Sequence, residues 1–140
     1  MSESIPDNGP ATEAALATLR ELRRGLLRLH KALLDDERAW YEQAHGLVSS
    51  GELLRLVISH EQFAWLRSFS ELIVRIDEML DAEEPATAAD ARVLFGQARA
   101  LVRPDATGTE FPRKYFAAIQ REPAVALAHR GVTKVLPTDA

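Results

Sequence analysis

One stretch of this sequence constrains the fold more than any other. From about Thr12 to His45 the only helix-breaking residue is Gly25, so one helix of roughly 34 residues, about 50 Å long, is allowed. Five leucines within it follow the heptad spacing of packed helices, at intervals of 3, 4, 3 and 4, and we call them the leucine stripe: Leu19, Leu22, Leu26, Leu29 and Leu33. The same line continues through Trp40, Ala44 and Leu47. Flanking apolar residues widen it into the face of a bundle helix: Leu16, Leu27, Leu34 and Tyr41.

A second long helix is predicted after a short turn. Gly46 can end the first helix, and Ser49-Ser50-Gly51-Glu52 has the Ser-x-x-Glu pattern of a helix capping box. From there to about Asp81 the chain has no proline and no internal glycine. We therefore expect one continuous helix from about Ser50 to Asp81 that returns antiparallel to the first.

Shorter helices are predicted beyond the break at Glu84-Pro85. They cover about Ala88 to Val102, about Pro112 to Arg121, and Pro123 to near Gly131, and no strand pattern appears. The predicted fold class is all-α: a helical bundle built on a long antiparallel helical hairpin, with two or three shorter C-terminal helices. Residues 1–11, rich in proline and polar residues, are predicted to be a disordered leader, and residues 12–136 a single domain.

Composition and charge exclude several classes of function. The 140 residues include no cysteine, which excludes disulfides, thiolate metal sites and a cysteine nucleophile. No stretch approaches about 18 apolar residues, so no transmembrane segment is predicted. The N-terminus lacks a basic segment followed by an apolar one, and a cytoplasmic location is expected. A net charge of -4 argues against a general nucleic-acid-binding surface.

Two acid-histidine pairs are the polar candidates for a site. His60-Glu61 lacks the second histidine of the zinc-protease His-Glu-x-x-His motif, so both residues are expected on the surface. Glu42 and His45 have the Glu-x-x-His spacing of di-iron bundles, but such bundles need two pairs, so a capping or surface role is expected. We predict no catalytic residue, metal ligand or cofactor.

Other charged residues are interpreted as surface features. The acidic run Asp35-Asp36-Glu37 is expected to be solvated. His30 is expected to be partly buried and hydrogen-bonded, and His129 to lie near a helix C-terminus. One side of the first helix is basic, through Arg20, Arg24, Arg28 and Lys31. We interpret this basic side as a solvent-exposed helix face. The alternatives are that it binds an acidic protein, a nucleic acid or an anionic membrane.

The second helix has more apolar surface than one partner helix covers. Projected at about 100° per residue, Leu56, Phe63 and Val74 lie together, well round from the centre of its main apolar face. Contiguous exposed apolar patches usually mark interfaces, so these three residues are the candidate interface of a homodimer. In the alternative, the short C-terminal helices fold back and bury the patch within one chain.

Two segments carry a resemblance. FAWLRSFSELIVRIDEML and KYFAAIQREPAVALAHRGV are similar to a group of short bacterial all-helical proteins to which no function is assigned. The similarity covers about residues 15 to 132. It implies a bacterial source and a helical fold, and no activity, cofactor or catalytic residue.

The functional prediction follows from these features. We expect a small helical-bundle protein that acts by self-association or by binding another protein. The alternative is a ligand- or metal-binding enzyme with a pocket between the helices, lined by Trp40, Tyr41, Trp65 and a histidine or carboxylate.

Overall fold

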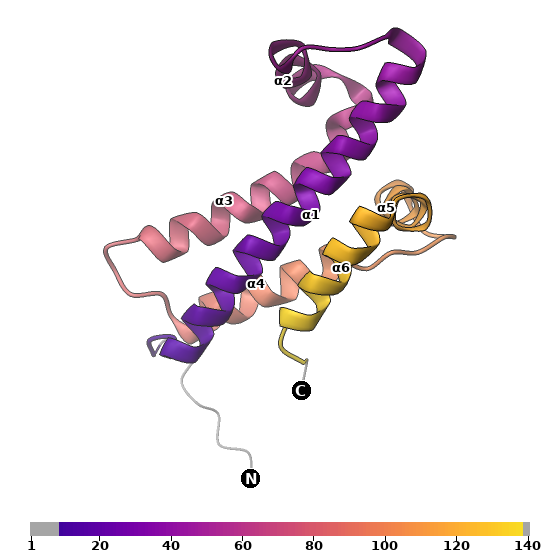
Figure 1. Ribbon diagram of the computed structural model, residues 1–140. Helices are drawn as coiled ribbons and strands as arrows, with labels where there is room; N and C mark the ends of the chain where they lie inside the picture. The colour runs from indigo at the N-terminus through magenta and orange to yellow at the C-terminus, as the bar shows by residue number, and fades with distance from the viewer. Residues whose placement is uncertain (1–8, 139–140) are drawn as a thin grey trace.

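The computed structural model describes residues 9–138 as a bundle of α-helices (Figure 1). Within this range there is no strand. The elements are α1 (Glu13–His45), α2 (Ser50–Ser59), the 3₁₀ helix η1 (Glu61–Leu66), α3 (Arg67–Asp81), α4 (Ala88–Leu101), α5 (Glu110–Arg121) and α6 (Pro123–Val135). The predicted all-α class and the shorter C-terminal helices are therefore confirmed.

The first helix is uninterrupted, as predicted. Thr12 caps its start by accepting a hydrogen bond from the backbone N–H of Ala15 at 3.0 Å. Gly46 ends it with a φ of 85°, a left-handed conformation that favours glycine. All five residues of the leucine stripe are fully buried in one core cluster. The stripe therefore places α1 at the centre of the bundle.

The second arm of the hairpin is broken, contrary to the prediction of one helix from Ser50 to Asp81. At His60 the backbone leaves the helical region, with φ -85° and ψ 135°, and η1 follows. His60 caps η1, because its ring Nδ1 accepts a hydrogen bond from the backbone N–H of Gln62 at 3.1 Å. Only η1 and α3 run back along α1, while α2 lies apart at the end of the molecule (Figure 1).

The core lies between α1 and the elements on either side of it. On one side, η1 and α3 pack antiparallel to α1. Side-chain hydrogen bonds join them to α1, among them one between His30 and Ser70 at 3.2 Å. On another side α6 runs antiparallel to α1, and α4 packs against both α1 and α3. Helix α6 continues through Gly131 to Val135, beyond its predicted end, because Val132 is fully buried in the core.

Part of the predicted leader belongs to the fold. The backbone N–H of Ala11 donates to the carbonyl of Ala86, and the N–H of Ala88 donates to the carbonyl of Gly9, both at 2.8 Å. Residues 9–11 are thus held against the start of α4, which corrects the prediction that all of 1–11 is disordered. The remaining leader, residues 1–8, lies outside the described residues.

Candidate functional site

The clearest hollow surface lies where α1 and α6 cross closely. Gly25 permits this approach, since a Cβ atom there would come within 3.2 Å of the Cγ2 of Val132. Small residues continue the junction on both helices: Ala32 on α1, and Ala124, Ala128 and Gly131 on α6. Because none has a side chain longer than a methyl group, an open groove remains above the line of contact.

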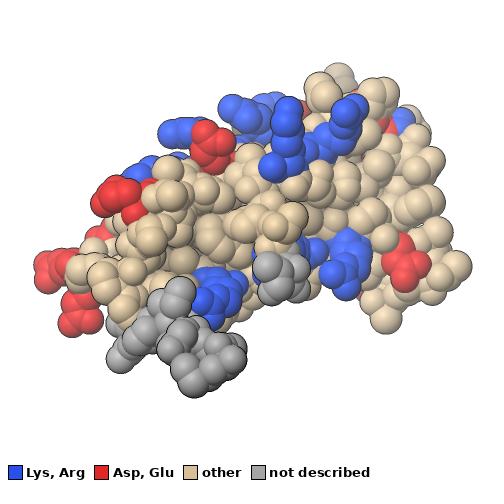
Figure 2. Space-filling view, turned by 90° about the horizontal axis from the view of Figure 1, so that it is seen from below, with Lys and Arg blue, Asp and Glu red and all other residues tan. Residues whose placement is uncertain are grey.

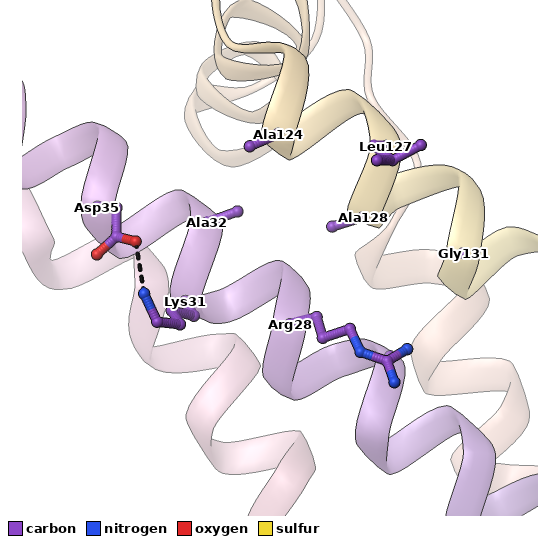
Figure 3. Close-up of a pocket in the computed structure, with 9 residues that line it drawn as sticks. Arg28, Lys31, Ala32, Asp35, Ala124, Leu127, Ala128 and Gly131 are labelled. Atoms are coloured by element: carbon purple, nitrogen blue, oxygen red, sulfur yellow. Dashed lines mark hydrogen bonds and ion pairs between the residues drawn. The ribbon is translucent and has the colours of Figure 1, made fainter.

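This feature, which we call the α1–α6 groove, has two parts. The larger holds about 530 Å³ and is lined by the small residues together with Arg28, Lys31, Asp35 and Leu127 (Figure 3). The second holds about 440 Å³ and continues the same junction toward the C-terminus of α6, between Ala17, Thr18 and Glu21 on α1 and Lys134 and Val135 on α6. The groove is lined on α1 by residues from Ala17 to Asp35 and on α6 by residues from Ala124 to Val135, so the part with two walls is about 17 Å long at 1.5 Å per residue.

The groove has an apolar floor and a mostly basic wall. Arg28 and Lys31 on α1 and Lys134 on α6 are exposed along the groove, and Lys31 donates to Asp35 at 2.8 Å. Leu127, also on α6, is 72% exposed. Viewed from below, several Lys and Arg side chains gather along one edge of the molecule (Figure 2). The groove has no cluster of acid, base and nucleophile, so its chemistry is that of a binding surface.

A second polar feature lies at the end of this junction. Asp36 and Glu37 are only 8% and 7% exposed, which corrects the expectation that the acidic run is solvated. Arg121 on α5 binds Asp36 with two nitrogens, Nε at 3.0 Å and Nη2 at 2.6 Å from Oδ2. Such a paired geometry offsets much of the cost of burying a carboxylate.

Glu37 is held by neutral donors from η1. Its Oε1 accepts from the indole Nε1 of Trp65 at 3.1 Å, and its Oε2 accepts from Nε2 of Gln62 at 2.9 Å. The nearest cation is Arg121, 3.9 Å from Oε1. Residues 62 and 65 are three apart, and side chains at that spacing eclipse in a 3₁₀ helix, which brings both donors to one carboxylate. The break at His60 therefore creates this arrangement.

A cleft of about 400 Å³ opens above Glu37, between α1, η1 and α5. Glu37 and Gln62 lie at its base, Trp40 forms one side, and Lys114 and Arg121 lie at its rim. The guanidinium of Arg121 sits 5.1 Å from the centre of the Trp40 ring. Of the three aromatic residues predicted to line a pocket, only Trp40 lines this cleft, while Trp65 hydrogen-bonds Glu37 from outside its lining. Tyr41 instead packs against His45, His60 and Phe63.

The burial of Asp36 and Glu37, though not of the exposed Asp35, could have been recognised from the spacing of the leucine stripe. Three and four residues after Leu33 the stripe reaches Asp36 and Glu37, before it resumes at Trp40. Charged residues at apolar positions of a helix stripe indicate a buried polar cluster. Nothing in the sequence, however, indicates that Arg121 and Gln62 are their partners.

Glu42 and His45 stabilise the connection between α1 and α2. The carboxylate of Glu42 accepts from the backbone N–H of Val48 at 2.9 Å, and Arg38 donates to the carbonyl of Val48 at 2.7 Å. The His45 ring stacks on Tyr41 and its Nδ1 hydrogen-bonds the carbonyl of Tyr41 at 3.1 Å. Within residues 9–138 no three His, Asp or Glu side chains are grouped so that they could hold a metal ion.

His60 and Glu61 differ in how far their side chains are buried. Glu61 is exposed, whereas His60 is half-buried against the rings of Tyr41 and Phe63, which corrects the expectation of a surface histidine. His129 lies inside α6 rather than at a helix C-terminus, and its Nδ1 shares a hydrogen bond with the hydroxyl of Tyr115. Burial lowers the pKa of His129 and His30 and raises the pKa of Tyr115, so each favours its neutral form.

The three candidate interface residues do not form one patch. Phe63 is fully buried in the core, Leu56 is half-buried, and Val74 is 52% exposed on α3. The broken helix explains the difference, because residues 56, 63 and 74 now belong to three separate elements. Phe63 is therefore not available to a partner in this conformation.

No helix within residues 9–138 combines the length and apolar character that crossing a bilayer requires. Comparison of the chain with protein-family models, curated proteins and solved structures found no match.

Proposed function

We propose that this protein acts by binding another protein, and that the α1–α6 groove receives an amphipathic helix whose polar edges are acidic. The observation that carries the proposal is the combination of an apolar floor, a basic wall and the exposed side chain of Leu127. An amphipathic helix buries its apolar face in such a groove and presents charges at the edges.

The shape of the groove favours a helix as its occupant. Its floor is built from glycine and alanine, so the backbone of a third helix can approach α1 and α6 closely. A length of about 17 Å matches about three turns of helix. The exposed Leu127 can insert between side chains of the bound helix, as apolar anchors do at interfaces.

The charges favour an acidic partner. Three basic residues line the groove, Arg28 and Lys31 at its centre and Lys134 on α6, whereas Asp35 and Glu21 lie toward its two ends. An acidic helix would be attracted electrostatically to the basic centre of the groove, and its affinity would therefore fall with added salt. A nucleic acid is disfavoured because an apolar floor offers nothing to phosphates and the chain is acidic as a whole, at -4.

A pair of synthetic peptides tests the proposal. Both are amphipathic helices of about 20 residues with leucine on one face, and they differ in carrying glutamate or lysine at the flanking positions. We expect fluorescence anisotropy to show binding of the acidic peptide only. Leu127→Glu removes the apolar anchor and Arg28→Glu reverses a charge of the wall. Each variant should weaken binding of the acidic peptide roughly tenfold or more.

Variants outside the groove provide the controls. Val93→Glu changes an apolar residue exposed on α4, and Arg103→Glu reverses a charge beyond the end of that helix, so neither should affect binding. Equal binding of the acidic and basic peptides, or unchanged binding by both groove variants, would contradict the proposal.

Self-association is a second candidate function, favoured by the apolar face of α2. Leu54 and Ile58 are 61% and 63% exposed, and Gly51 lies three residues before Leu54 on the same face. Leu47, 90% exposed, lies in the connection just before α2. In an antiparallel two-fold pair, Leu54 would meet Gly51 of the partner subunit.

The homodimer prediction is tested by light scattering across micromolar concentrations. We expect a mass twice the 15.5 kDa of one chain, and a return to the mass of one chain for Leu54→Glu. Circular dichroism of this variant should stay unchanged because Leu54 is exposed, and Val93→Glu is the matched control. The mass of a single chain at every concentration would rule out the dimer.

A further inference from the structure

We propose that the cleft above Glu37 binds a small zwitterion of the free α-amino acid class, with the ammonium group at Glu37 and the carboxylate at Lys114 and Arg121. This site is separate from the α1–α6 groove, and the inference does not depend on a protein partner.

The base of the cleft carries more negative charge than its one close cation balances. Two buried carboxylates, Asp36 and Glu37, share one close cation, Arg121, which is committed to Asp36. Glu37 receives only neutral donors within hydrogen-bonding distance. An ionised carboxylate can accept about four hydrogen bonds, so its two oxygens can accept further donors. A bound ammonium group would supply such donors together with the missing positive charge.

The rim of the cleft has the opposite charge. Lys114 and Arg121 have side chains 36% and 32% exposed, so both can contact a ligand from the solvent side. Lys114 also pairs with Glu110 at 3.1 Å, four residues earlier on the same helix, and such exposed pairs are weak. A carboxylate at the rim would therefore gain Lys114 and Nη1 of Arg121, the guanidinium nitrogen that does not bind Asp36, as cationic donors.

The walls accommodate an apolar substituent. Trp40 is 51% exposed and presents an aromatic surface, while Ala44 and Ala117 keep the cleft open. A volume of about 400 Å³ is sufficient for an amino acid with an aliphatic or aromatic side chain. A simple amine would face the two cations at the rim, and a simple carboxylate would face Glu37. A zwitterion satisfies both ends of the cleft.

Intrinsic tryptophan fluorescence can report binding at this site. It has two tryptophans; Trp40 lines the cleft and Trp65 donates to Glu37, whereas neither lines the α1–α6 groove. We would titrate the intact protein with each common amino acid and follow tryptophan fluorescence. For leucine, the matched probes are isoamylamine, which lacks the carboxylate, and 4-methylpentanoate, which lacks the amine.

We expect at least one amino acid to change the fluorescence with a dissociation constant below about 10 mM, and its matched amine and acid to bind roughly tenfold more weakly or worse. Glu37→Gln keeps an acceptor but removes the charge, so it should weaken binding of the amino acid by a similar factor and leave binding of the acid unchanged or stronger. If this variant fails to fold, Ala117→Phe provides the second test, because it fills the cleft from an exposed position and should abolish the response.

Three outcomes would overturn the proposal. The first is no response to any amino acid. The second is an amine or an acid that binds as tightly as its parent amino acid, which would show that only one end of the cleft is used. The third is unchanged binding by folded Ala117→Phe, which would place the ligand elsewhere.

Discussion

Replacing Leu29 by aspartate is expected to unfold most of the protein at room temperature. Leu29 is the fourth residue of the leucine stripe and is fully buried where α1 meets its neighbours. Truncating a buried leucine costs about 2–5 kcal/mol, and burying an unpaired carboxylate adds to that cost. Because domains are stable by only about 5–15 kcal/mol, little native protein should remain. Circular dichroism during urea denaturation measures the loss.

Leu27→Asp is the matched control, since it makes the same change two residues away at a position that is 41% exposed. Its cost should be about 1 kcal/mol or less, set by the lower helix propensity of aspartate. If the two variants unfolded at the same urea concentration, the assignment of the buried face of α1 would be wrong.

Phe63→Ala is expected to lower the free energy of unfolding by about 3–5 kcal/mol, the usual cost of removing a buried phenylalanine side chain. Phe63 is fully buried and its ring lies near those of Tyr41 and His60. On a continuous helix from Ser50 to Asp81 the same side chain would project toward solvent or a second chain, and the variant would keep its stability. Thermal and urea denaturation therefore distinguish the broken helix from the continuous one.

Val74→Ala provides the comparison for Phe63→Ala. Val74 was assigned to the same predicted interface but is half exposed on α3, so its truncation should change the stability by no more than about 0.5 kcal/mol. A large effect at Val74 together with a small one at Phe63 would contradict the burial of these residues described above.

The first helix and its buried face could be predicted because the information is local. The spacing of the leucine stripe and Gly46 lie within or beside α1, and each acts through neighbouring residues. The Ser49–Glu52 pattern likewise predicts the start of α2, where Ser49 accepts a hydrogen bond from the backbone N–H of Glu52. Patterns of this kind do not depend on which elements later pack together.

The break at His60 could not be predicted because its causes are tertiary. Nothing between Ser50 and Asp81 forbids a helix, and the interruption instead places Gln62 and Trp65 on Glu37, about 25 residues earlier in the chain. The groove was missed for a related reason. Gly25 was noted only as a helix breaker, whereas its role, the close approach of Val132, depends on a helix more than 100 residues away.

Helix α2 packs less tightly on the core than α1 and α3 do. It contributes no fully buried side chain and contacts the core through the partly buried Leu53, Leu56 and Val57, so unfolding it exposes less apolar surface than unfolding α1 or α3 would. Such a segment can open by itself while α1, α3 and α6 remain folded, so its amide hydrogens should exchange with solvent long before those of the core. Within this arm, α2 is thus the natural position for proteolytic nicking, whereas the connection before it is held by Glu42 and Arg38.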